Sequence, residues 1–236
     1  MSEPAVIELS AKGKNALGTD LLIRVLAEIR AAGGRPLLLT GAGDAFSAGL
    51  NLKEVVSLDG PQMEAFLRLL EETIEALLAY PGPTVAAVNG HAIAGGAVLA
   101  RCCDVAIATT NPRARIGLNE VAIGLRFPPR TFRAMAHKLP ARHHAEVLLG
   151  AGLHGPEDAL RLGLVDALDD DCLDAARGRL AALARHPPDA YAATKADLLR
   201  GVLDVTEHEL VSFIEEVVPV WTSAPIRARI RALLGG

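Results

Sequence analysis

Hydrophobic and polar positions along this chain follow two patterns, one typical of strands and the other of amphipathic helices. Short, mostly apolar runs predict strands, and they lie at 5–10, 35–41, 84–90 and 104–109. Longer segments with apolar residues three and four positions apart predict helices, and they lie at 21–32, 64–79 and, in a short form built of small residues, 94–103. Since strands alternate with helices, we expect an α/β fold.

The ends of two of these helices carry local signals. Thr19 or Asp20 is a candidate N-cap for the first helix, because a side-chain oxygen there can accept a free backbone N–H. Pro81 and Pro83 follow the second helix and forbid its continuation. The first helix is therefore expected to begin near Thr19 or Asp20, and the second to end before Pro81.

The last fifth of the chain differs from the rest. From His186 onward the sequence is helical in pattern and rich in charge, and Pro187 and Pro188 mark the change. We therefore expect a core region at 1–185 and a C-terminal helical region at 186–236. The tail is expected to pack on the core or on a neighbouring subunit, through aromatic residues such as Phe213 and Trp221.

Composition limits the class of protein and its partners. Half of the 236 residues are hydrophobic, so the chain can bury a substantial core, and aromatic residues make up only 3%, so that core is aliphatic. A net charge of −4 gives no basis for binding nucleic acid or an anionic membrane. The most apolar run, 84–100, is shorter than the roughly 20 residues of a membrane span.

The cysteines and the N-terminus suggest a compartment. Cys102, Cys103 and Cys172 show no metal-binding spacing, so we expect no metal site and a reducing, cytoplasmic environment. The first ten residues lack the basic and apolar regions of a signal peptide, which agrees with a cytoplasmic location.

The glycine-rich stretch TGAGDAFSAGLNL, at 40–52, fits two chemistries. In sugar kinases of the ribokinase type, a Gly-Ala-Gly-Asp turn at a helix start holds phosphate, and Asp44 would then be a base. That kinase motif follows a complete sugar-binding fold, whereas only about forty residues precede it here. The second possibility is a turn whose backbone N–H holds a thioester oxygen, which leaves Asp44 as a solvated loop residue.

A second stretch, NGHAIAGGA at 89–97, repeats the arrangement of strand, turn and small-residue helix. Two such junctions supply the two backbone N–H groups of an oxyanion hole, and the helix N-terminus strengthens the second donor. The alternative is structural, with Gly95 and Gly96 only permitting close packing of helix on sheet. His91, in the same stretch, either faces the pocket or fills a role in the turn.

The third element is RIGLNEVAIGL at 115–125, where Glu120 stands among apolar residues. Burial of a carboxylate raises its pKa, which suits a general base near neutral pH. The alternative is an ordinary glutamate at a helix start that points outward. Arg126 follows this segment and is a candidate for shaping the pocket.

Four segments occur in order along the chain and together resemble the crotonase superfamily, the enoyl-CoA hydratase/isomerase family: FSAGLNLKEV, AAVNGHAIAGGAVLARCCDVAIAT, IGLNEVAIGL and ALRLGLVDAL. The resemblance implies a spiral of ββα turns and a C-terminal helical region that assembles homotrimers or hexamers. It also implies an acyl-CoA thioester substrate, with no cofactor beyond the coenzyme A of the substrate.

The resemblance also implies roles for particular residues. The oxyanion donors are the backbone N–H groups of Leu50 and Gly95. The residues placed against coenzyme A or the substrate are Ser47, Ala48, Asn51, Leu52, Lys53 and Val98.

The acid/base positions indicate the reaction. Hydratases of this family use two glutamates, and the positions that correspond here hold Val98 and Glu120. Hydration calls for positioning a water and moving a proton to carbon, whereas moving a double bond needs one base. We therefore predict a Δ3 to Δ2 enoyl-CoA isomerase with Glu120 as its base. The alternatives are a hydratase, another lyase or hydrolase of this type, and an acyl-CoA-binding accessory protein without catalysis.

Overall fold

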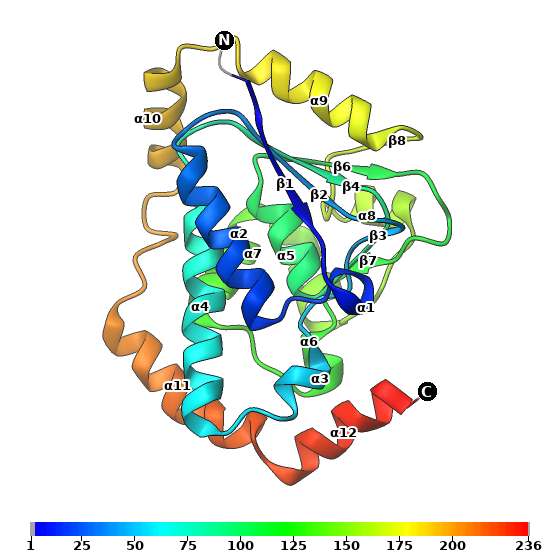
Figure 1. Ribbon diagram of the computed structural model, residues 1–236, viewed down its shortest axis with the longest axis vertical. Helices are drawn as coiled ribbons and strands as arrows, with labels where there is room; N and C mark the ends of the chain where they lie inside the picture. The colour runs from blue at the N-terminus through cyan, green and yellow to red at the C-terminus, as the bar shows by residue number, and fades with distance from the viewer. Residues whose placement is uncertain (1–2, 236) are drawn as a thin grey trace.

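Five parallel strands form the larger of two sheets in the computed structural model, which describes residues 3–235 (Figure 1). Their order across the sheet is β1 (Ala5–Leu9), β2 (Leu37–Gly41), β4 (Thr84–Val88), β6 (Val105–Thr109) and β8 (Ala167–Asp169). β2 and β4 are buried along their whole length, which explains why their sequences are almost continuously apolar. The four predicted strands are confirmed.

A smaller parallel sheet lies beside it, made of β3 (Ala45–Ser47), β5 (His91–Ile93) and β7 (Ile116–Gly117). Each of its strands follows a strand of the larger sheet in the chain: β3 follows β2, β5 follows β4, and β7 follows β6. A helix comes after each pair, so the ββα unit repeats as the chain advances. The predicted α/β spiral is therefore confirmed.

Helices cover both faces of the larger sheet. The described helices are α1 (Lys12–Asn15), α2 (Thr19–Ala32), α3 (Leu52–Val55), α4 (Gly60–Leu78), α5 (Gly95–Cys102), α6 (Glu120–Ile123), α7 (Pro129–Lys138), α8 (Pro156–Arg161), α9 (Cys172–Leu183), α10 (Pro188–Leu198), α11 (Glu207–Trp221) and α12 (Ala224–Gly235), with shorter turns at Ala141–His143 and Ala145–Leu149. Alternate residues of β2 face opposite sides: Leu38 packs towards α9, whereas Leu37 and Leu39 pack into the main core.

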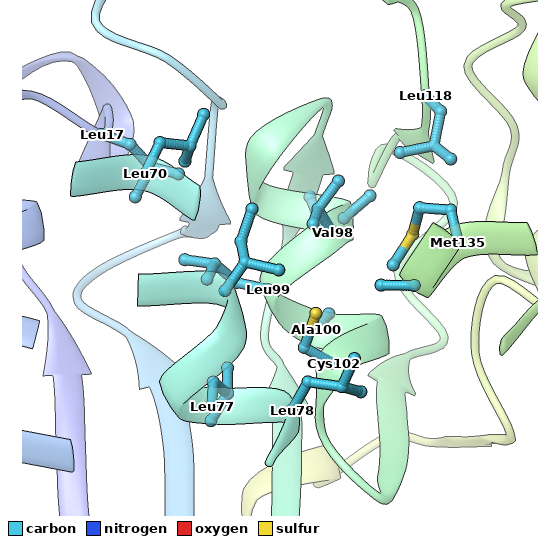
Figure 2. Close-up of a cluster of buried hydrophobic side chains, with 14 of the residues drawn as sticks. Leu17, Leu70, Leu77, Leu78, Val98, Leu99, Ala100, Cys102, Leu118 and Met135 are labelled. Carbon is cyan, nitrogen blue, oxygen red and sulfur yellow. The ribbon is translucent and has the colours of Figure 1, made fainter. Parts of the chain in front are cut away.

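The main core forms around α5, which is buried along its whole length. Figure 2 shows Val98, Leu99 and Cys102 of this helix facing leucines of α4 and a methionine of α7. Because Gly95, Gly96 and Ala97 open the helix, its first turn can approach the smaller sheet closely. A Cβ on Gly96 would lie 2.5 Å from the carbonyl oxygen of Ser47.

Two predicted helix starts need correction. Gly18 precedes α2, so neither Thr19 nor Asp20 is its N-cap. The backbone N–H of Thr19 instead donates to the carboxylate of Glu54 at 3.1 Å, and the Thr19 hydroxyl donates to the same group. The Glu54 side chain of α3 therefore accepts the free backbone N–H at the start of α2. Because Glu54 is distant in the sequence, a local capping signal does not reveal this contact.

The second correction concerns α4. This helix begins at Gly60 rather than at residue 64, because Asp59 and Gln62 form a capping box in which each side chain bonds the other residue's backbone N–H.

The C-terminal helices pack against the rest of the chain. α11 contacts α4 and α7, and α12 contacts α3 and α6 (Figure 1). Phe213 and Trp221 are buried in the main core. The C-terminal helices therefore pack on the core, which is one of the two expected arrangements. The predicted boundary at residues 185 and 186 falls between α9 and α10, and the division into two domains stays a prediction. No helix among residues 3–235 has the length and apolar character to cross a membrane.

Candidate active site

A pocket of about 190 Å³ opens where the two glycine-rich junctions, α6 and the C-terminal helices meet. Its wall is mostly aliphatic and aromatic, with a few polar groups. The lining residues are Ala48, Leu50, Leu52, Leu70, Ile74, Ile93, Ala94, Gly95, Val98, Asn119, Glu120, Ile123, Leu125, Arg126, Phe127, Pro128, Thr131, Trp221 and Leu233. The pocket therefore includes both predicted oxyanion donors, the predicted base and Val98.

The first junction requires glycine. Gly49 has a φ of +85°, and a Cβ there would lie 2.6 Å from the carbonyl oxygen of Ile93. The N–H groups on either side of Leu50 are used: that of Gly49 donates to the Ser47 hydroxyl, and that of Asn51 donates to the Leu17 carbonyl. Among the described hydrogen bonds none is donated by the Leu50 N–H, so this donor is free for a ligand.

The second junction presents its donor at a helix start. Gly95 is the first residue of α5, where a backbone N–H has no acceptor within the helix. The preceding residue, Ala94, has a φ of +48° and a ψ of −120°, a backbone conformation that is rare for a residue with a Cβ. A Cβ on Gly95 would lie 4.0 Å from the Leu50 nitrogen, so the two predicted donors are neighbours.

Glu120, the first residue of α6, reaches the pocket with one of its two carboxylate oxygens unpaired. Its Oε2 is buried and has no hydrogen-bond partner among the described residues. Burial raises the pKa of Glu120 to about 7, as expected for a carboxylate in apolar surroundings. A carboxylate with that pKa can take up and return a proton near neutral pH.

Asn119 is a pocket residue that the sequence analysis missed. Its Oδ1 is also buried without a partner in the described part of the chain. A signal was present in the sequence, since the amide directly precedes Glu120 in the same apolar segment. Two oxygen acceptors therefore stand unpaired in one small pocket.

Val98 lines the pocket with a side chain that is 1% exposed. It occupies the first turn of α5, directly after the second glycine junction. An apolar group consequently stands where hydratases of this family are expected to carry their other glutamate.

The residues placed against coenzyme A divide into two groups. Ala48 and Leu52 line the pocket. Ser47, Asn51 and Lys53 do not. Contacts of all five residues with coenzyme A or the substrate stay predictions. The Ser47 hydroxyl donates to the Asn15 carbonyl at 2.8 Å and thereby supports the Gly49 turn. The Asn51 amide donates to Glu54 at 3.3 Å, and Lys53 is exposed.

The side chain of Asn15 stabilises the first junction through hydrogen bonds to its backbone. This residue has a φ of +58°, and its Nδ2 donates to the carbonyl oxygens of Ala42 and Ala45 at 2.9 and 2.8 Å. The loop that precedes Gly49 is therefore tied to the N-terminal segment. Asp44 in this loop is largely exposed and pairs with Lys14, as expected for a solvated loop residue.

Glu71 stabilises the part of the pocket wall that contains Thr131. It was not identified from the sequence alone. It is fully buried on α4 and accepts hydrogen bonds from the backbone N–H groups of Arg130 and Thr131 at 2.7 and 3.1 Å, and from the Thr131 hydroxyl at 2.7 Å. These contacts cap α7 from another helix and fix Thr131 in the pocket wall.

The two residues left open in the sequence analysis lie in different places. His91 is outside the pocket, where its Nδ1 accepts a hydrogen bond from the Arg115 backbone at 3.2 Å, so its role is in the turn. Arg126 lines the pocket, as suggested. No group of three or more His, Cys, Asp or Glu side chains that could hold a metal ion occurs among residues 3–235.

Comparison with known proteins adds to this geometry. A family model described as enoyl-CoA hydratase/isomerase matches residues 5–216. A Mycobacterium tuberculosis protein named probable enoyl-CoA hydratase EchA17 is 31% identical over 210 residues, covering 86% of this chain and 78% of that protein.

Solved structures share the fold over nearly the whole chain. Human mitochondrial delta3-delta2-enoyl-CoA isomerase superposes with a TM-score of 0.88 at 24% identity, covering 98% of this chain and 93% of its own. An enoyl-CoA isomerase of Mycobacterium tuberculosis superposes with a TM-score of 0.82 at 29% identity, covering 92% and 95%. Since these relatives bear both hydratase and isomerase names, the similarity does not distinguish the two reactions.

Proposed function

The chain belongs to the enoyl-CoA hydratase/isomerase family, and from that membership we propose that it moves the double bond of an enoyl-CoA thioester from Δ3 to Δ2. The observation that carries the proposal is a pocket lined by one carboxylate, Glu120, and by an apolar Val98. Moving a double bond needs one base that acts twice, whereas hydration also needs a group that orients water.

In the proposed mechanism Glu120 takes the proton from C2 of the 3-enoyl thioester. The electron pair of that C–H bond delocalises onto the thioester oxygen and gives a dienolate. The backbone N–H groups of Leu50 and Gly95 donate to this oxygen, where negative charge develops. The protonated carboxyl of Glu120 then returns the proton to C4, the double bond moves to C2–C3, and the base is restored.

The raised pKa of Glu120 supports this double role. With a pKa near 7 the carboxylate is a stronger base than an ordinary glutamate, and its protonated form is still acidic enough to return the proton. The mostly apolar lining around Val98 limits contact with water, so the proton held on Glu120 can return to C4 before it exchanges with solvent.

One observation favours hydration as the second candidate. The unpaired oxygens of Asn119 and Glu120 stand in the same pocket and together would accept both hydrogens of a bound water. Asn119 would then orient the water, while Glu120 would take a proton from the water as its oxygen adds to C3 and would deliver that proton to C2.

Parallel assays decide between the two reactions. With 3-hexenoyl-CoA we expect conversion to trans-2-hexenoyl-CoA, and with trans-2-hexenoyl-CoA we expect hydration slower by orders of magnitude. In deuterated water, part of the product should retain the proton of the substrate, because a shielded base carries it from C2 to C4. Efficient hydration without isomerisation, lost in an Asn119→Ala variant, would replace the isomerase proposal with the hydratase one.

We also propose that the chains assemble as a homotrimer or hexamer in the cytoplasm and use no cofactor besides substrate coenzyme A. Light scattering of the purified protein tests the assembly, since three chains of 24.7 kDa give a mass well separated from that of one.

A further inference from the structure

A second hollow adjoins the pocket and shares one wall with it. This groove has a volume of about 610 Å³ and runs between α6, α7 and α11. Its lining residues are Val121, Leu125, Arg126, Phe127, Pro129, Phe132, Arg133, His208, Glu209, Ser212, Phe213 and Glu216. Leu125, Arg126 and Phe127 line both hollows, so this tripeptide is the partition between them.

Arg126 is the member of the partition that reaches across to the C-terminal helices. Its Nη1 lies 2.7 Å from Oε2 of Glu216 on α11, and its guanidinium stands 5.6 Å from the centre of the Phe213 ring. The loop after α6 is thereby tied to α11. Both members of the ion pair are about two-thirds exposed, and such pairs are weak. One side chain in weak contacts can therefore be removed without breaking the core.

The size of the pocket limits the length of acyl chain that its walls can surround. A cavity of about 150 Å³ holds one benzene molecule, so a pocket of about 190 Å³ accepts an acyl chain of about six carbons. The groove beyond the partition offers further apolar surface, since Val121 is 46% and Phe132 is 49% exposed there. A longer chain would gain that surface only by passing Arg126.

We propose that Arg126, held by Glu216 and Phe213, closes the distal end of the acyl pocket and makes this chain selective for short-chain enoyl-CoA thioesters. The inference rests on the proposed function for the identity of the reaction, but the selectivity applies to binding as well as to turnover. When the side chain of Arg126 is shortened, the pocket joins the groove and longer chains gain apolar contact there.

The test measures binding of unreactive saturated thioesters, butanoyl-, octanoyl- and dodecanoyl-CoA, by calorimetry, followed by turnover of 3-enoyl-CoAs of matching length. The variants are Arg126→Ala, which removes the partition side chain, and Glu216→Gln, which removes only its ion pair. Arg133→Gln is the matched control, because Arg133 pairs with Glu209 at 2.6 Å and lines the groove but not the pocket.

The unmodified protein should bind butanoyl-CoA at least as tightly as dodecanoyl-CoA. Arg126→Ala should shift the ratio of these affinities towards dodecanoyl-CoA by at least about tenfold, since each methylene buried adds about fourfold. Glu216→Gln should shift the ratio in the same direction by less, and Arg133→Gln should leave it unchanged.

Two results would overturn the inference: affinity of the unmodified protein that rises steadily up to dodecanoyl-CoA, or an unchanged ratio in both Arg126→Ala and Glu216→Gln. If Arg126→Ala fails to fold, the ratio in Glu216→Gln decides alone. The expected binding ratios without turnover of any 3-enoyl-CoA would refute the isomerase proposal and leave the role of Arg126 standing.

Discussion

At the scale of single residues, two buried carboxylates near the pocket have opposite surroundings. Glu71 accepts three hydrogen bonds from Arg130 and Thr131, so its position is fixed and its oxygens are occupied. Glu120 has a buried oxygen with no partner in the described structure, so it is free to act on a substrate. The surroundings of the two carboxylates therefore favour a structural role for Glu71 and a role in proton transfer for Glu120.

The pH dependence of the proposed reaction follows from Glu120. Because a base must be unprotonated and burial raises the pKa of Glu120 to about 7, kcat/KM should rise with pH and level off above neutrality. A Glu120→Gln variant should lose about 10²–10⁴-fold in kcat while still binding an unreactive acyl-CoA. Rates measured with 3-hexenoyl-CoA across pH provide the check, and a Gln variant with unmodified rates would remove Glu120 from the mechanism.

The same residue should affect stability. The pKa of Glu120 is raised from 4.5 to about 7 in the folded protein, so the folded state binds the additional proton between these values and stability falls as pH rises through them. Glu120→Gln removes this charge and should raise the free energy of unfolding by about 2–3 kcal/mol above pH 7, and by little near pH 4.

Urea unfolding at both pH values measures the difference. Glu157→Gln, at an exposed position on α8, is the control and should change stability by no more than about 0.5 kcal/mol at either pH. A Glu120→Gln variant that is less stable than the unmodified protein at high pH would contradict the assigned burial of an unpaired charge.

At the scale of elements, the two glycine junctions set the oxyanion donors side by side. Gly49 lets the chain turn against β5, and Gly95 starts α5 next to Leu50. Both junctions connect the smaller sheet to a helix, so the repeating ββα unit itself creates the donor geometry. The strained backbone of Ala94 is held by a hydrogen bond from its N–H to the Gly117 carbonyl at 2.8 Å.

Alanine variants of two glycines with positive φ, Gly49 and Gly43, distinguish an effect on the oxyanion donor from an effect of backbone strain alone. Gly49→Ala adds a Cβ that meets the Ile93 carbonyl at 2.6 Å, so we expect the turn to shift and kcat to fall by about 10²-fold as the Leu50 donor moves. Gly43→Ala is the matched control: its φ is +71°, but a Cβ there has no heavy atom within 4 Å, so only about 1–2 kcal/mol of stability should be lost.

Activity and thermal unfolding of the two variants, measured together, provide the comparison. Equal activity in both folded variants would show that the Leu50 N–H does not need its observed position.

At the scale of the whole molecule, the pocket is assembled from segments that are distant in the chain. The junctions and α6 supply the polar end, α4 supplies Leu70 and Ile74, and the C-terminal helices supply Trp221 and Leu233. The C-terminal region therefore completes the site rather than only extending the fold.

This assembly predicts an optical signal. Trp221 is the single tryptophan of the chain and lines the pocket, so its fluorescence should change when an acyl-CoA binds. Titration with hexanoyl-CoA should give a saturating change that CoA alone reproduces only weakly. A Trp221→Phe variant should give no signal but still bind by calorimetry. Unchanged emission at saturating hexanoyl-CoA would place the acyl chain elsewhere.

Local pattern by itself determined four strands of the larger sheet, β1, β2, β4 and β6, and their alternation with helices. The short strands β3, β5, β7 and β8 were not predicted, because two or three residues are too few to show a strand pattern. The glycine junction at Gly95 and the isolated carboxylate of Glu120 are visible in a few adjacent residues. The donor role of Gly95 and the meaning of Val98 came from the resemblance to the crotonase superfamily, and these roles stay predictions. The capping box of α4 is also local, so this helix could have been placed correctly from its Asp59 and Gln62.

Only the tertiary structure decided which groups have partners. Glu54 satisfies the start of α2 from 35 residues away, and Arg126 meets Glu216 across 90 residues. That Oε2 of Glu120 has no partner among the described residues likewise depends on how distant segments pack around the pocket. Pairing and burial depend on packing between distant segments, and the energies that set a pKa or close a pocket arise there, so no local pattern of the chain contains them.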